Sequence, residues 1–202
     1  GGLETEATVG LPSSPPFRNV SPTELVAILS SPNAWRRETS ARLLYERQDA
    51  KAVPALLKLA VESEYHIGRL HALYALSGLD QLKPNHLVTA MSDRHPFLRE
   101  HAIRLAESFL VKDINSSRPL AQAMLALARD KSPRVRLQFA LTSGVVEFPG
   151  ELPALLETLA VSGKDPWIRS AVLNALSAQV NELFSHFADS VPPTDASEVV
   201  AL

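Results

Sequence analysis

Five related stretches decide the fold of this chain: Trp35-Arg36-Arg37-Glu38-Thr39-Ser40-Ala41, His66-Ile67-Gly68-Arg69-Leu70-His71-Ala72, Phe97-Leu98-Arg99-Glu100-His101-Ala102, Arg134-Val135-Arg136-Leu137-Gln138-Phe139-Ala140 and Trp167-Ile168-Arg169-Ser170-Ala171-Val172. Each contains an arginine at the same aligned place, and successive arginines are separated by 32, 30, 37 and 33 residues. Self-similarity at a period of this length is typical of proteins built from stacked supersecondary units.

The segments around these stretches have helical character. Stretches of roughly 10–17 residues are rich in Ala, Leu, Glu and Arg, which favour helix. Ser21-Pro22-Thr23-Glu24 has the pattern of a capping box with proline at the first helical position. Ser132-Pro133 and Asp165-Pro166 repeat the combination of a capping residue and proline. No run alternates apolar β-branched residues with polar ones, so the sequence predicts an all-α fold.

Each repeat is predicted to hold two helices. Val53-Pro54-Ala55-Leu56-Leu57-Lys58-Leu59-Ala60 and Leu152-Pro153-Ala154-Leu155-Leu156-Glu157-Thr158-Leu159-Ala160 are near duplicates and precede the arginine stretches of their repeats. Because a single helix pair cannot bury its apolar face alone, we expect a right-handed α-solenoid of about five helix pairs. The expected boundaries are a linker or tail over 1–20, the solenoid over 21–187, and a loop with the start of a truncated further repeat over 188–202.

The pattern of this repeat resembles the HEAT repeat. Asp93 and Asp130 each stand six residues before a repeat arginine, and a small or apolar side chain stands three residues after each of the five arginines. We expect the arginine row, with these aspartates, to be structural and to pair with carboxylates of neighbouring turns as an incomplete ladder. The residues of this row are Arg37, Arg69, Arg99, Arg136, Arg169, Asp93 and Asp130.

A closer resemblance covers residues 20–44, 52–56 and 69–76. These segments look like the HEAT region of the PVC-type haem-binding proteins, a family of membrane-bound dehydrogenase-like proteins common in planctomycetes and verrucomicrobia. The resemblance implies a parent protein with a sugar-dehydrogenase-like propeller, HEAT repeats and a cytochrome c domain, in an extracytoplasmic location. This chain matches the middle part only and has no Cys. The resemblance therefore implies no catalytic, haem-binding or other cofactor-binding residue in this chain.

Composition narrows the classes of partner. The 202 residues carry a net charge of −2, which gives no electrostatic reason to expect nucleic acid or an anionic membrane. No apolar run approaches the roughly 18 residues of a membrane span. The six histidines show no metal-ligand spacing, and His71 and His101 are expected about 10 Å apart. The expected partner is a protein.

The candidate partner surface lies on the second helices. Positions two and five after each arginine are expected to face away from the core and to line a concave, mixed polar face. We call these residues the second-helix face: Thr39, Arg42, His71, Tyr74, His101, Arg104, Gln138 and Asn174. Trp35 and Trp167 stand at matching repeat positions, either packed between helices or exposed as anchors.

The resulting hypothesis is a non-catalytic scaffold or protein–protein interaction module, excised from a larger dehydrogenase-like cytochrome c protein. No nucleophile elbow, phosphate loop or metal motif favours an enzyme. Two alternatives remain open: a HEAT-like enzyme, similar to bilin lyases or DNA glycosylases, and a purely structural spacer.

Overall fold

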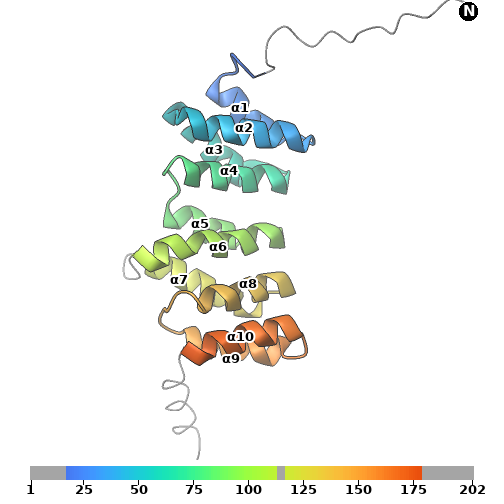
Figure 1. Cartoon of the computed structure of the whole chain (residues 1–202), viewed down its shortest axis with the longest axis vertical. Coiled ribbons are helices and arrows are strands. Elements are labelled where there is room, and N and C mark those ends of the chain that lie inside the picture. Colours follow the sequence, from blue (N-terminus) through green and yellow to red (C-terminus); the bar gives the residue numbers. More distant parts are fainter. Residues whose placement is uncertain (1–16, 113–116, 179–202) are drawn as a thin grey trace, which may run out of the picture. The chain divides into compact units, whose positions relative to one another are not determined.

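The computed structural model describes residues 17–112 and 117–178, and every regular element within them is helical, which confirms the all-α fold class (Figure 1). Ten α-helices and two short 3₁₀ helices make up this described part. In chain order they are α1 (Pro22–Ile28), α2 (Ala34–Arg47), η1 (Ala50–Ala52), α3 (Val53–Glu62), α4 (His66–Gly78), α5 (Pro84–Met91), α6 (Pro96–Lys112), α7 (Arg118–Leu125), η2 (Ala126–Arg129), α8 (Pro133–Ser143), α9 (Glu151–Ser162) and α10 (Pro166–Ala178).

The helix starts follow the signals in the sequence. Ser21 accepts a hydrogen bond from the Glu24 amide at 3.3 Å, and the Glu24 carboxylate accepts one from the Ser21 amide at 2.8 Å, so the predicted capping box is confirmed. Helices α6, α8 and α10 all begin at a proline. Proline suits this position because its fixed backbone angle is helical and its missing N–H has no partner there anyway.

The chain divides into two compact units, and the first is Gly1–Leu82. In it α1 packs on α2 and α3 packs on α4, while α1 also contacts α3 and α2 contacts α4. Four fully buried leucines fill the space between them: Leu25, Leu29, Leu56 and Leu76. Each helix therefore covers its pair partner on one side and its counterpart in the neighbouring pair on another.

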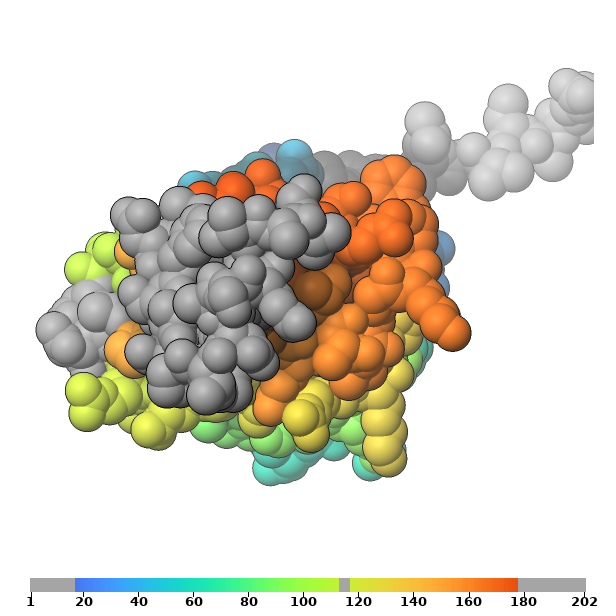
Figure 2. Space-filling view, turned by 90° about the horizontal axis from the view of Figure 1, so that it is seen from below, coloured from blue at the N-terminus to red at the C-terminus, as the bar shows by residue number. Residues whose placement is uncertain are grey.

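The second unit is Lys83–Leu202 and repeats this arrangement. Helix α5 packs on α6, η2 on α8, and α9 on α10, while the second helices form the series α6, α8, α10. The first helices also meet, α5 with α7 and η2 with α9. The largest fully buried side chains here include Phe139, Ile103, Leu120 and Met124. Seen from below, α9 (orange) forms part of the surface of this unit (Figure 2).

Residues just before the expected start of the helices also pack in the first unit. Phe17 is buried and its ring meets the Trp35 ring edge to face, with centroids 5.7 Å apart. Arg47 donates hydrogen bonds to the main-chain carbonyls of Val20 and Phe17. Residues 17–20, placed in the linker by sequence, thus contact α2. The expected further repeat at 188–202 lies outside the described residues.

Candidate functional site

Four of the five repeat arginines make the same contact with the main chain. In each, Nη1 donates to the carbonyl oxygen of the residue six positions earlier, at 2.8 Å for both Arg37 and Arg99. That carbonyl lies in the turn after the first helix of the pair, where helix carbonyls lack partners within the helix and the dipole is negative. The arginines thereby hold first and second helices together, through the acceptor carbonyls of Ser31, Ser63, Asp93 and Asp130.

The residue that offers this carbonyl also shapes the turn through its side chain. The Asp93 carboxylate accepts the amide of His95 at 2.7 Å, and that of Asp130 accepts the amide of Ser132 at 2.8 Å. Side-chain oxygens that accept from an amide two residues later form a turn of their own. Ser31 and Ser63 act in the same way in the first two repeats. The sequence analysis named only the two aspartates of this position. Ser31 and Ser63 also stand six residues before a repeat arginine, and this shared position was a signal in the sequence.

In the second unit the arginines also connect one helix pair to the next. Arg99 donates from Nε and Nη2 to the two carboxylate oxygens of Asp130, both at 2.7 Å. Burial alone would raise the pKa of Asp130, but hydrogen bonds from Arg99 and the Ser132 amide hold that pKa below its usual value. Arg136 continues the series by donating from Nε to the Ser162 hydroxyl. The contacts place three consecutive turns beside one another.

The two ends of the arginine row differ from its middle. The Nε atom of Arg37 is buried and has no hydrogen-bond partner among the described residues. At the other end, Arg169 is exposed. Within the described residues, its side chain does not make the hydrogen bond to the carbonyl six residues earlier that the other four arginines make. The ladder thus has one carboxylate rung in the second unit, from Arg99 to Asp130.

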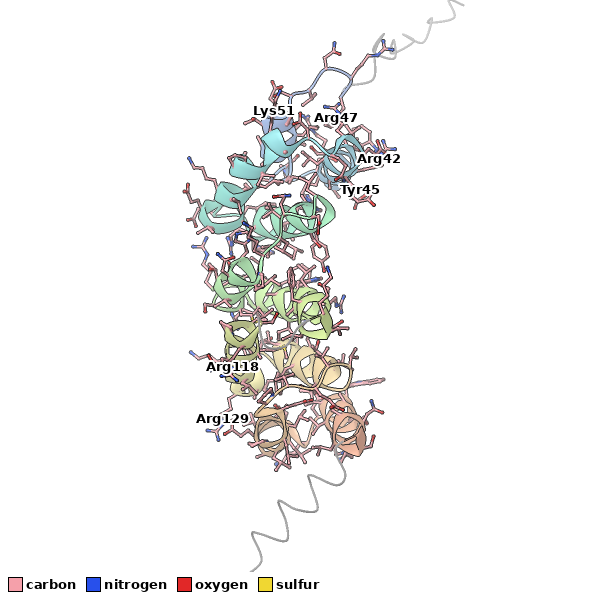
Figure 3. All side chains as sticks on the ribbon, turned by 90° about the vertical axis from the view of Figure 1, so that its left-hand side faces the viewer. Arg42, Tyr45, Arg47, Lys51, Arg118 and Arg129 are labelled. Carbon is pink, nitrogen blue, oxygen red and sulfur yellow. The ribbon has the colours of Figure 1, made fainter. Side chains whose placement is uncertain are left out.

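In the first unit, the residues of the second-helix face lie at the surface of α2 and α4. Arg42 projects from α2 (Figure 3) and lies 3.6 Å from Glu46 one turn later. Thr39 and His71 are half-buried, and Tyr74 is exposed. Burial lowers the pKa of His71, and the nearby Arg37 charge lowers it further, against a smaller opposite effect of Glu38.

In the second unit, part of the face is joined into a polar network between α6 and α8. Arg104 is exposed and donates to the Gln138 side-chain carbonyl at 3.1 Å. Gln138 is buried, and its amide donates to Thr142 at 3.1 Å, while the Thr142 hydroxyl donates to Glu107 at 2.6 Å. The network therefore places Gln138 between the helices and leaves the Arg104 side chain at the surface.

Two further residues complete the second-helix face. His101 is half-buried with its ring 4.5 Å from that of Phe97, and burial is the largest cause lowering its pKa. Asn174 is exposed on α10, next to the position where a Cβ on Gly144 would lie. The structure thus gives the face exposed residues on four of the five second helices, α2, α4, α6 and α10, and a buried one, Gln138, on α8.

Three other observations bear on chemistry. Trp167 is 76% exposed and Trp35 is 57% exposed. Within the described ranges, no three or more His, Asp or Glu side chains gather in a way that could hold a metal ion. Within the same ranges, no helix combines the length and apolar character needed to cross a membrane.

Comparisons with known proteins find similarity at the level of structure only. No protein-family model matches the chain, and no curated protein matches it. Sixteen chains of solved structures do match. One is a crystal structure of an engineered protein, a target of the Northeast Structural Genomics Consortium. It is 16% identical over 89% of this chain and 92% of that chain, with a TM-score of 0.47.

Proposed function

We propose that this chain is a non-catalytic scaffold whose helix pairs stack as a HEAT-like α-solenoid and which binds a protein through its second-helix face. The observation that carries the proposal is the repeated contact from an arginine to the carbonyl six residues earlier. Four turns built in one way support a repeat architecture, because stacked identical units share nearest-neighbour contacts.

The character of the second-helix face supports a protein partner. Its exposed members include Arg42, Tyr74, Arg104 and Asn174, a mixture of aromatic, basic and amide side chains. Arg and Tyr are enriched among residues that contribute most to protein–protein binding. A polar, wet surface of this kind suits a non-obligate protein interface.

The resemblance to the PVC-type haem-binding proteins adds a second element to the proposal. On that basis the scaffold joins an oxidoreductase-like propeller to a cytochrome domain and fixes their geometry. The test is the mass and haem stain of the native gene product. A band much larger than 22.0 kDa that stains for haem supports this context. A haem-free product near that mass contradicts it, and turnover of a sugar or alcohol donor by the isolated chain contradicts a non-catalytic role.

The interaction itself is tested with variants of the face. The face variant is the native gene product with both Tyr74→Ala and Asn174→Ala. Its complexes are compared with those of wild type by native mass measurement. The matched control is Lys58→Ala, an exposed side chain on the first helix α3 paired with Glu62. Loss of the complex in the face variant alone supports the proposal, whereas equal complexes in all three proteins contradict it.

A further inference from the structure

The turns between first and second helices carry a surplus of positive charge in the second unit. We define the turn edge as residues 92–100, 130–136 and 163–169, which hold each turn and the start of the following helix. These residues include seven basic and four acidic side chains. Since the whole chain carries a net charge of −2, this edge is a local departure from the average.

Three of the basic side chains stand in register. Arg94, Lys131 and Lys164 each lie five residues before a repeat arginine, and all three are exposed. The corresponding positions of the first unit are Pro32 and Glu64, so the repeat itself does not require a cation there. Neither Lys131 nor Lys164 forms an ion pair with any residue that the structure describes.

The three turns are neighbours along one edge of the unit. Asp130 accepts two hydrogen bonds from Arg99, and Ser162 accepts one from Arg136, so the second and third turns are each tied to the start of the preceding second helix. The guanidinium of Arg134 also lies 5.7 Å from the centre of the Phe97 ring. Since packed helices are about 8–10 Å apart, the cations in register follow one another at about this spacing.

The acidic residues of the edge are already engaged within the protein. Asp130 binds Arg99, and Glu100 lies 3.1 Å from Arg134. Asp165 accepts the amides of Trp167 and Ile168 and thereby caps α10. Beside these paired groups, the indole of Trp167 is 76% exposed. The edge therefore offers cations and one large aromatic side chain to a partner.

We propose that the turn edge binds an extended acidic peptide segment of a partner protein, with carboxylates about three residues apart. A peptide in the extended polyproline II conformation has three residues per turn and rises about 3.1 Å per residue. Carboxylates three residues apart therefore lie on one face about 9 Å apart, so successive carboxylates would meet successive cations. Electrostatic complementarity steers and orients such a partner, and an exposed indole gives it an apolar anchor. No residue of the turn edge belongs to the second-helix face, so this inference stands independently of the function proposed above.

The test uses the full chain and a fluorescein-labelled peptide of repeated Asp-Gly-Ser, with an Asn-Gly-Ser peptide as its neutral partner. Fluorescence anisotropy is measured at low salt with wild type, with Lys131→Glu/Lys164→Glu, and with the control Lys83→Glu/Arg118→Glu. The control makes the same change of charge at exposed residues of the same unit, at the opposite ends of the helix pairs. Circular dichroism shows whether both variants remain folded.

We expect the acidic peptide alone to bind, with affinity lowered by about tenfold or more in the edge variant and by about twofold or less in the control. In a Trp35→Phe background, binding should also shift the fluorescence of the remaining Trp167. Equal losses in both variants, or no binding of the acidic peptide, would overturn the proposal. So would tighter binding of single-stranded nucleic acid or anionic vesicles that is lost in the edge variant.

Discussion

Arg99 donates two hydrogen bonds of 2.7 Å to the Asp130 carboxylate, and its third nitrogen donates one of 2.8 Å to the main-chain carbonyl of Asp93. One guanidinium thus closes its own helix pair and attaches the next. The side chains of the pair are 15% and 7% exposed, so the charges are largely removed from water. Arginine suits this site because its planar fork can serve a carboxylate and a second acceptor at once.

Removing the Asp130 carboxylate should destabilise the second unit strongly. We expect Asp130→Ala to lower the free energy of unfolding by about 2–4 kcal/mol, because it leaves Arg99 charged and without its partner. Asp130→Asn keeps an oxygen for the Ser132 amide and should cost less. Urea unfolding of both variants measures the difference. Equal losses would show that the oxygen offered to the Ser132 amide contributes nothing, and no loss in either variant would show that the Asp130 carboxylate does not stabilise the unit.

A carboxylate at position 63 should stabilise the first unit. Ser63 occupies the register of Asp93 and Asp130, and the Nε atom of Arg37 is buried without a partner in the described structure. We expect Ser63→Asp to raise the free energy of unfolding by about 1 kcal/mol, through a charged hydrogen bond to Arg37. Ser63→Asn preserves the turn without the charge and is the control. No gain of Asp over Asn would contradict the expected contact.

Gly68 should not tolerate a methyl group. A Cβ there would lie 2.2 Å from the Ser30 hydroxyl and 3.2 Å from both Ser30 Cβ and the Ser63 hydroxyl. We expect Gly68→Ala to cost about 1–3 kcal/mol by overpacking, in spite of the better helix propensity of alanine. Thermal unfolding measures this loss, and adding Ser30→Ala should recover part of it.

Gly78 provides the comparison for that variant. A Cβ at Gly78 would lie 2.9 Å from the Tyr45 ring, but this ring is 63% exposed and can turn aside. Gly78→Ala should therefore cost less than Gly68→Ala. The reverse order would mean that the contact with Ser30 is not what excludes a larger residue.

The half-buried His71 should make the fold sensitive to mild acid. Because burial and the Arg37 charge lower its pKa in the folded state, the folded chain binds fewer protons than the unfolded chain below the usual histidine pKa of about 6.5. Its contribution to stability is complete above that pH and decreases as pH falls toward the folded pKa. Asp130 acts in the same direction only at lower pH, near and below the usual aspartate pKa of about 4, because its lowered pKa lets the unfolded chain take up the proton first.

The measurement is the urea midpoint at pH 7.5 and at pH 5.5. Wild type should lose stability between these values, and His71→Gln should lose less. The pKa values of His86 and His101 are also lowered, so part of the loss will persist in the variant. If His71→Gln loses as much stability as wild type, the environment of this histidine is not the cause.

The sequence predicted the helical class and many of the helix starts because these depend on local chemistry. The capping box at Ser21 and the prolines at Pro133 and Pro166 act within one helical turn. For the arginine row, the sequence predicted pairing with carboxylates of neighbouring turns, as an incomplete ladder that uses Asp93 and Asp130. The structure instead gives the carbonyl six residues earlier as the acceptor common to four repeats, which no residue pattern could reveal.

The second-helix face shows the same limit. Position two after the repeat arginine is half-buried at Thr39, His71 and His101 but buried at Gln138. The difference arises from Glu107 and Thr142, which are distant in sequence and draw the glutamine into a network between two helices. Register predicts the direction of a side chain, whereas its burial depends on partners from another repeat.

The arginine contact also separates the requirements of folding from those of recognition. Its common acceptor is a main-chain oxygen, and every amino acid supplies one. In the four repeats that make this contact, the neighbouring turn position accordingly carries proline, glutamate, arginine and lysine, at Pro32, Glu64, Arg94 and Lys131. A scaffold made in this way can vary the chemistry of these turns, repeat by repeat, while the arginine that closes the four helix pairs stays the same.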